Sequence, residues 1–149
     1  MDNPTQSDPA QLLAESAGAA MYARDQASQG LGMALTAIGP GHASIRMTVR
    51  QDMLNGHLTC HGGFLFALAD SAFAFACNSY NLHTVGIGCT IDYLAPGYPG
   101  DVLTADAMEQ SLRGKNGIYD VRVTNQDGYL IAVFRGKSLR LAGKAAPAT

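Results

Sequence analysis

The hydrophobic pattern of the chain begins as a helix. From Leu13 onward, apolar residues recur at intervals of three and four positions. Asp8, Pro9 and Gln11 precede them in an order typical of a helix start, with an N-cap, a proline in the first turn and a capping-box partner. A glycine, Gly30 or Gly32, is expected to end this helix.

Two strand-like segments follow the first helix. Residues 31–38 are mostly apolar, and the Gly-Pro-Gly sequence at 39–41 predicts a turn. Residues 45–49 then alternate between apolar and polar side chains, as in a half-buried strand. This pattern predicts two neighbouring strands joined by a short turn.

The segment from His61 to Tyr80 is predicted to be one long helix. It is rich in alanine and leucine, contains no proline and has few β-branched residues. At ~1.5 Å per residue it spans roughly 30 Å. Its side chains are apolar on every face, which is typical of a helix surrounded by protein. Asp70 is its one charged residue.

The second half of the chain reads as strands joined by glycine-containing turns. Strands are predicted at residues 85–93, 102–112, 119–124 and 130–141. Short turns between consecutive strands predict an antiparallel sheet, and one long apolar helix needs a concave sheet to wrap it. The predicted fold class is therefore α+β, in a single domain over residues 1–149. The tail from about residue 143 is expected to be disordered.

Charge and composition exclude several classes of protein. The chain has ten basic and twelve acidic residues, a net charge of −2 and no basic run, which argues against nucleic acid or a membrane surface as its partner. The polar N-terminus does not resemble a secretory signal. Cys60, Cys77 and Cys89 lack disulfide spacing, so they are expected to be packing residues in a cytoplasmic protein.

Asp70 is the residue that raises a chemical question. Gly62 and Gly63 begin the same helix, where free N–H groups favour a developing negative charge and glycines let a ligand approach the backbone. Asp70 lies eight residues after Gly62, too far for both to act on one carbonyl within a single chain. The spacing suits two helices from two subunits running antiparallel. The alternative is a structural carboxylate that bonds a facing helix or loop end.

Three motifs carry a resemblance to a known family. They are "NGH…CHGG…LAD.AFA.ACN" over residues 55–78, "CTIDYLAPG" over 89–97 and "FRGKS" over 134–138. Together they resemble the hotdog-fold acyl-coenzyme A thioesterases of the phenylacetic acid degradation type. The resemblance covers most of the chain, about residues 22–141.

The resemblance implies a fold, an assembly and a set of site residues. The fold is a hotdog, a curved antiparallel sheet wrapped around one central helix; chains form dimers, and two dimers form a homotetramer with active sites at the dimer interface. Asp70 corresponds to the family's catalytic carboxylate, Gly62 to its oxyanion donor and Asn55 to its water-orienting amide. His61 is the motif histidine beside the site. The substrates are aryl-acyl and ring-hydroxylated aryl-acyl coenzyme A thioesters.

The implied reaction is hydrolysis of the thioester. Asp70 serves either as general base for a water or as a nucleophile that forms a mixed anhydride, and the sequence does not choose between them. No cofactor is expected, since coenzyme A is part of the substrate. Its phosphates need cations, for which Lys115 and Lys137 are candidates beside Arg113 and Arg135. Solvation alone explains charges of this kind more often than a phosphate partner does.

Two alternative functions remain open at this stage, and metal binding is considered beside them. A hotdog hydratase would use Asp70 together with His61, and a non-catalytic acyl-coenzyme A sensor would need neither. His57 and His61 have the spacing of a helical zinc pair, but Asn55 and Gly56 predict a loop there and no third ligand is evident, so no metal is expected.

Overall fold

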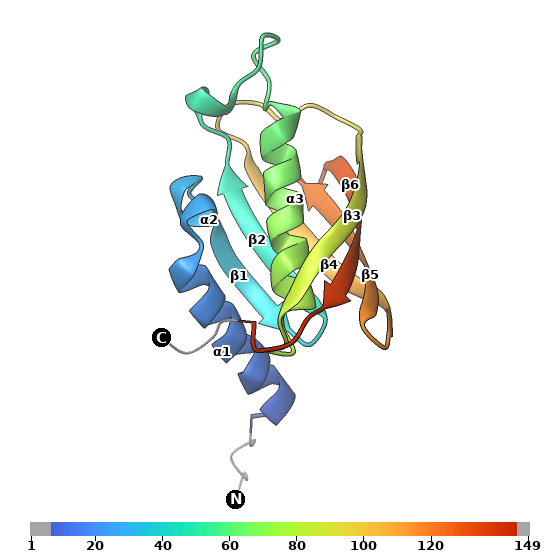
Figure 1. Cartoon of the computed structure of the whole chain (residues 1–149). Coiled ribbons are helices and arrows are strands. Elements are labelled where there is room, and N and C mark those ends of the chain that lie inside the picture. The colour runs from blue at the N-terminus through green and yellow to red at the C-terminus, as the bar shows by residue number, and fades with distance from the viewer. Residues whose placement is uncertain (1–6, 146–149) are drawn as a thin grey trace, which may run out of the picture.

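The computed structural model describes residues 7–145 and shows a six-stranded antiparallel sheet curved around one long helix (Figure 1). The helices are α1 (Pro9–Arg24), α2 (Gln26–Gly30) and α3 (Gly62–Cys77), with a short 3-10 turn, η1 (Gln51–Met53). The strands are β1 (Ala34–Gly39), β2 (His42–Thr48), β3 (Thr84–Tyr93), β4 (Val102–Arg113), β5 (Asn116–Thr124) and β6 (Leu130–Arg140). The predicted α+β class and the order of the predicted elements are confirmed.

The sheet has the strand order β1-β2-β4-β5-β6-β3, and every neighbouring pair is antiparallel. Strands β4, β5 and β6 are consecutive in sequence and pair through tight turns, as predicted. Strand β3 follows α3 and pairs with β6, so the chain crosses the width of the sheet at this point. This crossing leaves β1 and β3 as the two edge strands.

Phe73 fixes how closely the sheet wraps α3. Its ring is buried and lies 5.6 Å from the Tyr119 ring and 5.8 Å from the Phe134 ring, centroid to centroid. Gly86 on β3 and Gly136 on β6 face this ring, and a Cβ on either glycine would come within 3.0 Å of it. The two glycines therefore let the backbone of two strands approach the aromatic side chain directly.

The sequence predicts that α3 is surrounded by protein, and the single chain leaves one face of the helix uncovered. Gly63 and Asp70 are exposed, and Ala67 and Ala74 on the same face are only partly buried. Residues at this spacing share one face of a helix. The sheet covers the opposite face, where Leu68 and its neighbours are buried (Figure 1).

α3 ends at Cys77, three residues before the predicted end at Tyr80. The Asn78 side chain donates hydrogen bonds to the carbonyl oxygens of Ala74 (2.8 Å) and Thr84 (2.9 Å), and its Oδ1 accepts one from the Thr84 N–H (2.9 Å). Asn78 thus ends the helix and attaches the first residue of β3 to it.

The predicted first helix is divided in two. It begins as expected, with the Asp8 side chain accepting from the Ala10 N–H, but it breaks at Asp25. The Asp25 carboxylate accepts hydrogen bonds from the N–H and the hydroxyl of Ser28, so it caps the separate helix α2, which ends at Gly30. The interior aspartate competes for the backbone and starts a new helix.

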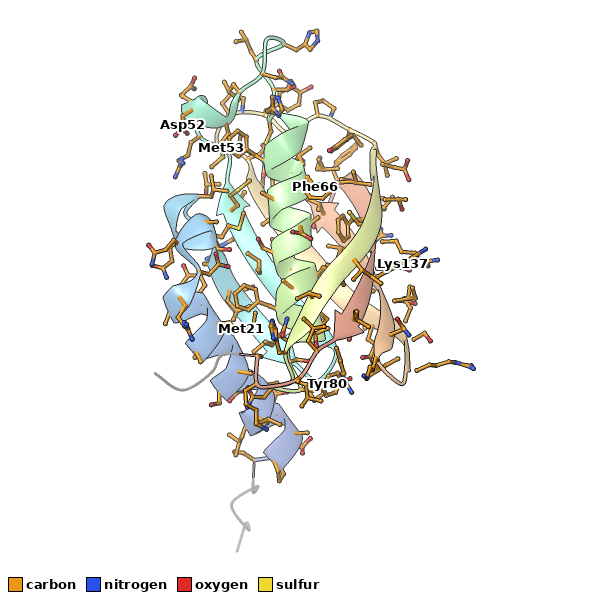
Figure 2. The ribbon with its side chains drawn as sticks, viewed as in Figure 1. Met21, Asp52, Met53, Phe66, Tyr80 and Lys137 are labelled. Carbon is orange, nitrogen blue, oxygen red and sulfur yellow. The ribbon has the colours of Figure 1, made fainter. Side chains whose placement is uncertain are left out.

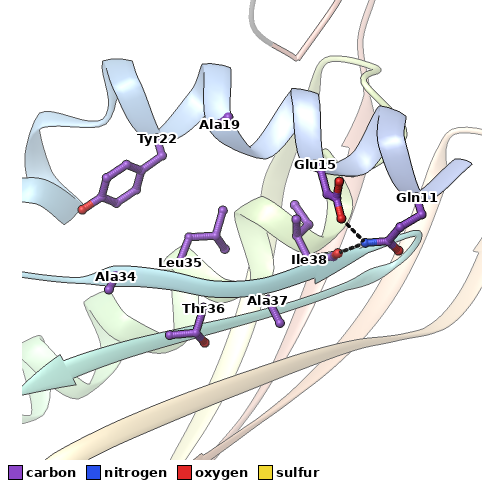
Figure 3. Close-up of a pocket in the computed structure, with 9 residues that line it drawn as sticks. All are labelled: Gln11, Glu15, Ala19, Tyr22, Ala34, Leu35, Thr36, Ala37 and Ile38. Carbon is purple, nitrogen blue, oxygen red and sulfur yellow. Dashed lines mark hydrogen bonds between the residues drawn. The ribbon is translucent and has the colours of Figure 1, made fainter. Parts of the chain in front are cut away.

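The predicted capping-box role of Gln11 is wrong. Its amide donates instead to the Ile38 carbonyl oxygen (2.6 Å) and to Glu15 (3.1 Å), which joins α1 to β1 (Figure 3). A hollow of about 610 Å³ lies between these two elements. Its lining residues are Gln11, Glu15, Ala19, Tyr22, Ala34, Leu35, Thr36, Ala37 and Ile38, none of which is a predicted site residue.

The three cysteines do not share one environment. Cys60 and Cys77 are buried as predicted, and burial raises the pKa of their thiols to about 11 and about 12. Cys89 is exposed on the edge strand β3, which the sequence pattern did not indicate. Two buried thiols with raised pKa are unreactive at neutral pH.

The C-terminal tail is described only in part. The predicted disordered tail begins at about residue 143, where the Gly143 carbonyl oxygen accepts a hydrogen bond from the His83 N–H (2.9 Å). Residues 146–149 lie outside the described part of the chain. Among residues 7–145, no helix is long and apolar enough to cross a bilayer.

The contact between Gly136 and Phe73 yields a stability prediction. Gly136→Ala places a Cβ 2.8 Å from three atoms of the buried Phe73 ring, and we expect it to lower the free energy of unfolding by about 1–3 kcal/mol through overpacking. Gly30→Ala is the control, since a Cβ there meets nothing within 4 Å. Urea unfolding of both variants measures the difference, and equal stabilities would contradict the assigned packing.

Candidate active site

Asn55 organises the loop that leads into α3. Its Oδ1 accepts hydrogen bonds from the backbone N–H groups of His57 (2.9 Å) and Thr59 (3.2 Å) and from the Thr59 hydroxyl (3.3 Å). Backbone donors at Oδ1 fix the orientation of the amide. The Asn55 Nδ2 has no acceptor among residues 7–145, so it is available to donate to a water or a carboxylate.

His61 caps the N-terminus of α3. Its Nδ1 accepts a hydrogen bond from the Gly63 N–H (2.9 Å), so a neutral His61 ring carries its proton on Nε2. The Gly62 N–H has no acceptor in the described part of the chain. The cap therefore satisfies one N–H of the first turn and leaves the preceding one free at the positive end of the helix dipole.

Tyr93 contacts Gly62 through its hydroxyl and its ring. Its hydroxyl donates to the Gly62 carbonyl oxygen (3.1 Å), and its ring lies so close that a Cβ on Gly62 would sit 3.1 Å from Cζ. The last residue of β3 thus fixes the first residue of α3. Tyr93 was not among the site residues predicted from the sequence, although it lies within the "CTIDYLAPG" motif.

A hollow of about 400 Å³ opens beside the free Gly62 N–H. Its lining residues are Asn55, Thr59, Cys60, Gly62, Leu65, Tyr93, Leu94, Ala95 and Pro96. Two of the predicted site residues, Asn55 and Gly62, therefore meet in one hollow, and His61 caps the helix at its edge. This arrangement suits a bound carbonyl oxygen, because the N–H donors of Gly62 and Asn55 both remain unused.

Asp70 does not line this hollow. It lies on the uncovered face of α3, about 12 Å farther along the helix axis, where it borders a separate hollow of about 350 Å³. The carboxylate forms no hydrogen bond or ion pair with residues 7–145, so nothing in the single chain supports the structural alternative. Desolvation by the apolar surface around it raises the pKa of its carboxyl group.

The predicted cations for the coenzyme A phosphates lie away from both hollows. Lys115 is exposed in the turn between β4 and β5, and Lys137 is exposed on β6, pointing away from α3 (Figure 2). Arg135 is engaged with Asp120 through two hydrogen bonds of 2.6 and 2.8 Å. Within one chain, neither lysine is brought to Asp70 or Gly62.

The structure also places two further residues, Asp92 of the CTIDYLAPG motif and His57. Asp92 is exposed on the edge strand β3, borders a hollow on the outer face of the sheet, and lines neither hollow beside α3. His57 is exposed in the loop after Asn55 and is not helical. Among residues 7–145, no group of three or more His, Cys, Asp or Glu side chains is arranged to hold a metal ion.

The capping role of His61 yields a prediction that stability measurements check. His61→Ala removes the acceptor of the Gly63 N–H, and we expect a loss of about 1 kcal/mol in the free energy of unfolding. His61→Asn supplies a new side-chain acceptor at the N-cap and should recover most of this loss. Equal destabilisation in both variants, measured by urea unfolding, would show that the histidine acts through packing instead.

Comparisons with known proteins show the family to which the chain belongs. The sequence profile of the thioesterase superfamily matches residues 57–132, which include His61, Gly62 and Asp70. The chain is 48% identical over 124 residues to acyl-coenzyme A thioesterase PaaI of Escherichia coli (strain K12), covering 83% of this chain and 89% of that protein.

Solved structures extend the match to three dimensions. The structure of the E. coli PaaI protein from the phenylacetic acid degradation operon superposes with a TM-score of 0.89 and 46% identity, over 90% of this chain and 97% of that one. A mutant of the phenylacetic acid degradation protein PaaI from Thermus thermophilus gives 0.76 and 40%, over 78% and 100% of the two chains. The protein therefore belongs to the hotdog-fold acyl-coenzyme A thioesterases of the phenylacetic acid degradation type, and it is a thioester hydrolase.

Proposed function

We propose that the protein hydrolyses phenylacetyl or ring-hydroxylated phenylacetyl coenzyme A to the free acid and coenzyme A during phenylacetic acid degradation in the cytoplasm. The names of its relatives in E. coli and T. thermophilus refer to an acyl-coenzyme A thioesterase and to phenylacetic acid degradation, and they support this pathway. The acyl group follows from the pathway. The observation that carries the proposal is the division of the site: free donors lie in one hollow, and an unpartnered carboxylate lies in another.

A second copy of the chain completes the site in this proposal. Two α3 helices packed antiparallel through their uncovered faces bring Asp70 of one chain opposite Gly62 of the partner subunit. The edge strand β3 supports this assembly, since it has a free edge next to that face and exposes Ile87. Pairing of two β3 strands joins the sheets, and two such dimers form the homotetramer.

The reaction needs only the groups that the two chains supply. The free N–H of Gly62 at the helix N-terminus binds the thioester oxygen and stabilises the negative charge that develops there. Asp70 takes a proton from a water whose oxygen bonds to the carbonyl carbon, or attacks that carbon itself to form a mixed anhydride that water then opens. The carbon–sulfur bond breaks, and coenzyme A leaves as a thiolate.

The neighbours of Asp70 and Gly62 have supporting roles. The Nδ2 of Asn55 is free to hold the water or the attacking carboxylate, whereas its Oδ1 is used by the loop. His61 positions the first turn and has Nε2 left for the thioester region. A raised pKa makes Asp70 a stronger base once it is ionised, and burial at the interface adds to that effect.

Gly63 at this interface and two lysines outside it are proposed to recognise coenzyme A. Gly63 is exposed beside the free N–H of Gly62, which lets the thioester approach the backbone. Lys115 and Lys137 are exposed and form no ion pair within residues 7–145, so they remain available to the phosphates. Membership of a thioesterase family favours hydrolysis over the hydratase and sensor alternatives.

Thiol release from a panel of coenzyme A thioesters tests the proposal. We expect the wild type to hydrolyse phenylacetyl and hydroxyphenylacetyl esters better than benzoyl and short straight-chain esters. Asp70→Asn keeps the shape of the side chain and should lose about 10²-fold or more in kcat. Asp92→Asn, which removes another exposed carboxylate, should retain wild-type activity. Binding of esters without thiol release by the wild type would contradict the proposal and restore the sensor alternative.

Mixing two inactive variants tests whether the site spans two chains. Asn55→Asp keeps the oxygen that holds the loop and removes the Nδ2 donor, whereas Asp70→Asn removes the carboxylate. Each variant alone should be inactive. A hybrid dimer contains one intact site, so random assembly of the two should restore about a quarter of wild-type activity. Co-expression in equal amounts, with all assembled protein assayed and no selection of hybrids, measures this. A mixture as inactive as the parents would contradict a shared site.

A further inference from the structure

The hollow beside Asp70 continues along α3 toward the C-terminal end of the helix. It has a volume of about 350 Å³ and is bordered by four parts of the chain: α1, α3, the start of β3 and the segment after β6. Its lining residues are Met21, Asp70, Phe73, Ala74, Asn78, His83, Thr84, Val85, Gly86 and Ala145. Figure 2 shows Met21 on α1, level with the lower half of α3.

The helix itself gives the hollow its direction. Ala74 and Asn78 follow Asp70 at intervals of four residues, so the three side chains lie in a row on one helix face. Asn78 is therefore about 12 Å from Asp70 along the helix axis. Met21, Phe73 and Val85 supply apolar walls between these two ends. A molecule that enters at Asp70 meets an apolar middle before it reaches the far end.

The polar groups at the far end are almost all satisfied. Asn78 uses its amide and its oxygen in hydrogen bonds to Ala74 and Thr84. The Thr84 hydroxyl donates to the Leu82 carbonyl oxygen (2.8 Å). These side chains form a wall and do not present unused donors to the hollow. Among the polar side chains that line it, Asp70 and His83 are left.

His83 combines a fixed backbone with an unused ring. Its N–H donates to the Gly143 carbonyl oxygen (2.9 Å), and its carbonyl oxygen accepts from the Leu141 N–H (2.7 Å). The residue is half-buried, and its ring nitrogens form no hydrogen bond with residues 7–145. An imidazole ring can both donate and accept, as a hydroxyl group can. The ring is thus held at the end of the hollow without a partner of its own.

We propose that His83 selects the acyl group by hydrogen bonding to a hydroxyl at the far end of its ring. This inference rests on the proposed function, since the thioester carbon must lie at Asp70. The hollow is at the small end of ligand pockets, which are roughly 300–1,000 Å³, so it suits one aromatic ring better than a long aliphatic chain. An unsubstituted ring fills the apolar middle and leaves His83 unpaired, so the ring-hydroxylated ester is preferred.

The ratio of kcat/KM for 4-hydroxyphenylacetyl coenzyme A to that for phenylacetyl coenzyme A measures this selection. We expect His83→Leu to lower the ratio about tenfold, the effect of one lost hydrogen bond to a half-buried group, mainly through KM of the hydroxylated ester. His83→Gln retains a donor and an acceptor and should keep part of the preference. His42→Leu is the matched control, because His42 lies on β2 outside the hollow.

Hydrolysis of the unsubstituted ester, phenylacetyl coenzyme A, shows whether a failed prediction concerns His83 alone or the proposed function as a whole. Unchanged hydrolysis of phenylacetyl coenzyme A shows that His83→Leu is folded and that its catalytic groups are in place. If the wild type and His83→Leu then have the same ratio, the role of His83 is wrong while the proposed function stands. If the wild type hydrolyses neither ester, the proposed function is wrong, and the role of His83 is overturned with it.

Discussion

Partial coverage of an apolar helix is the constraint on which the rest of this structure depends. α3 needs a concave apolar surface, and the sheet provides one because Gly86 and Gly136 let two strands approach the Phe73 ring directly. A six-stranded sheet closes around one side of the helix only. The opposite face stays open, and that face carries Asp70. An uncovered face with small residues and one carboxylate is suited to a second helix of the same kind.

The contacts around the N-terminus of α3 leave two N–H donors, those of Gly62 and Asn55, without an acceptor among residues 7–145. His61 satisfies the Gly63 N–H, and Tyr93 binds the Gly62 carbonyl oxygen, so the Gly62 N–H is held in place without an acceptor. Asn55 divides its amide in the same way, with Oδ1 in the loop and Nδ2 free. Preorganised donors of this kind cost little reorganisation when charge develops on a bound oxygen.

The strands could be predicted because their local signals are strong. Alternating apolar residues and glycine turns indicated every strand from β2 to β6, and the long alanine-rich segment indicated α3. Boundaries were less accurate where a side chain competes with the backbone. Asp25 starts a new helix and Asn78 ends α3 early, since each bonds backbone groups that a continuous helix would use. Hydrophobic periodicity contains no information on such competition.

The exposure of α3 could not be predicted for a different reason. A helix with apolar residues on every face is consistent both with burial in one chain and with burial between two. The apolar pattern did not choose between the two, whereas the spacing of Asp70 and Gly62 favoured the second. Only the strand order, which places β3 at an edge beside that face, shows that one chain leaves the helix half covered.

By itself the sequence determined the fold class and the order of the elements, and its motifs named the residues that we propose for the chemistry. Those properties follow from local periodicity, turn residues and motifs that need no knowledge of long-range contacts. Tertiary structure decided which groups meet: Asn55 with Gly62 in one hollow, and Asp70 with His83 in another. It also placed His61 as the cap of α3 and brought the Tyr93 hydroxyl to the Gly62 carbonyl oxygen. Such placements depend on how distant segments cross, because a side chain acquires a partner only when packing brings one to it.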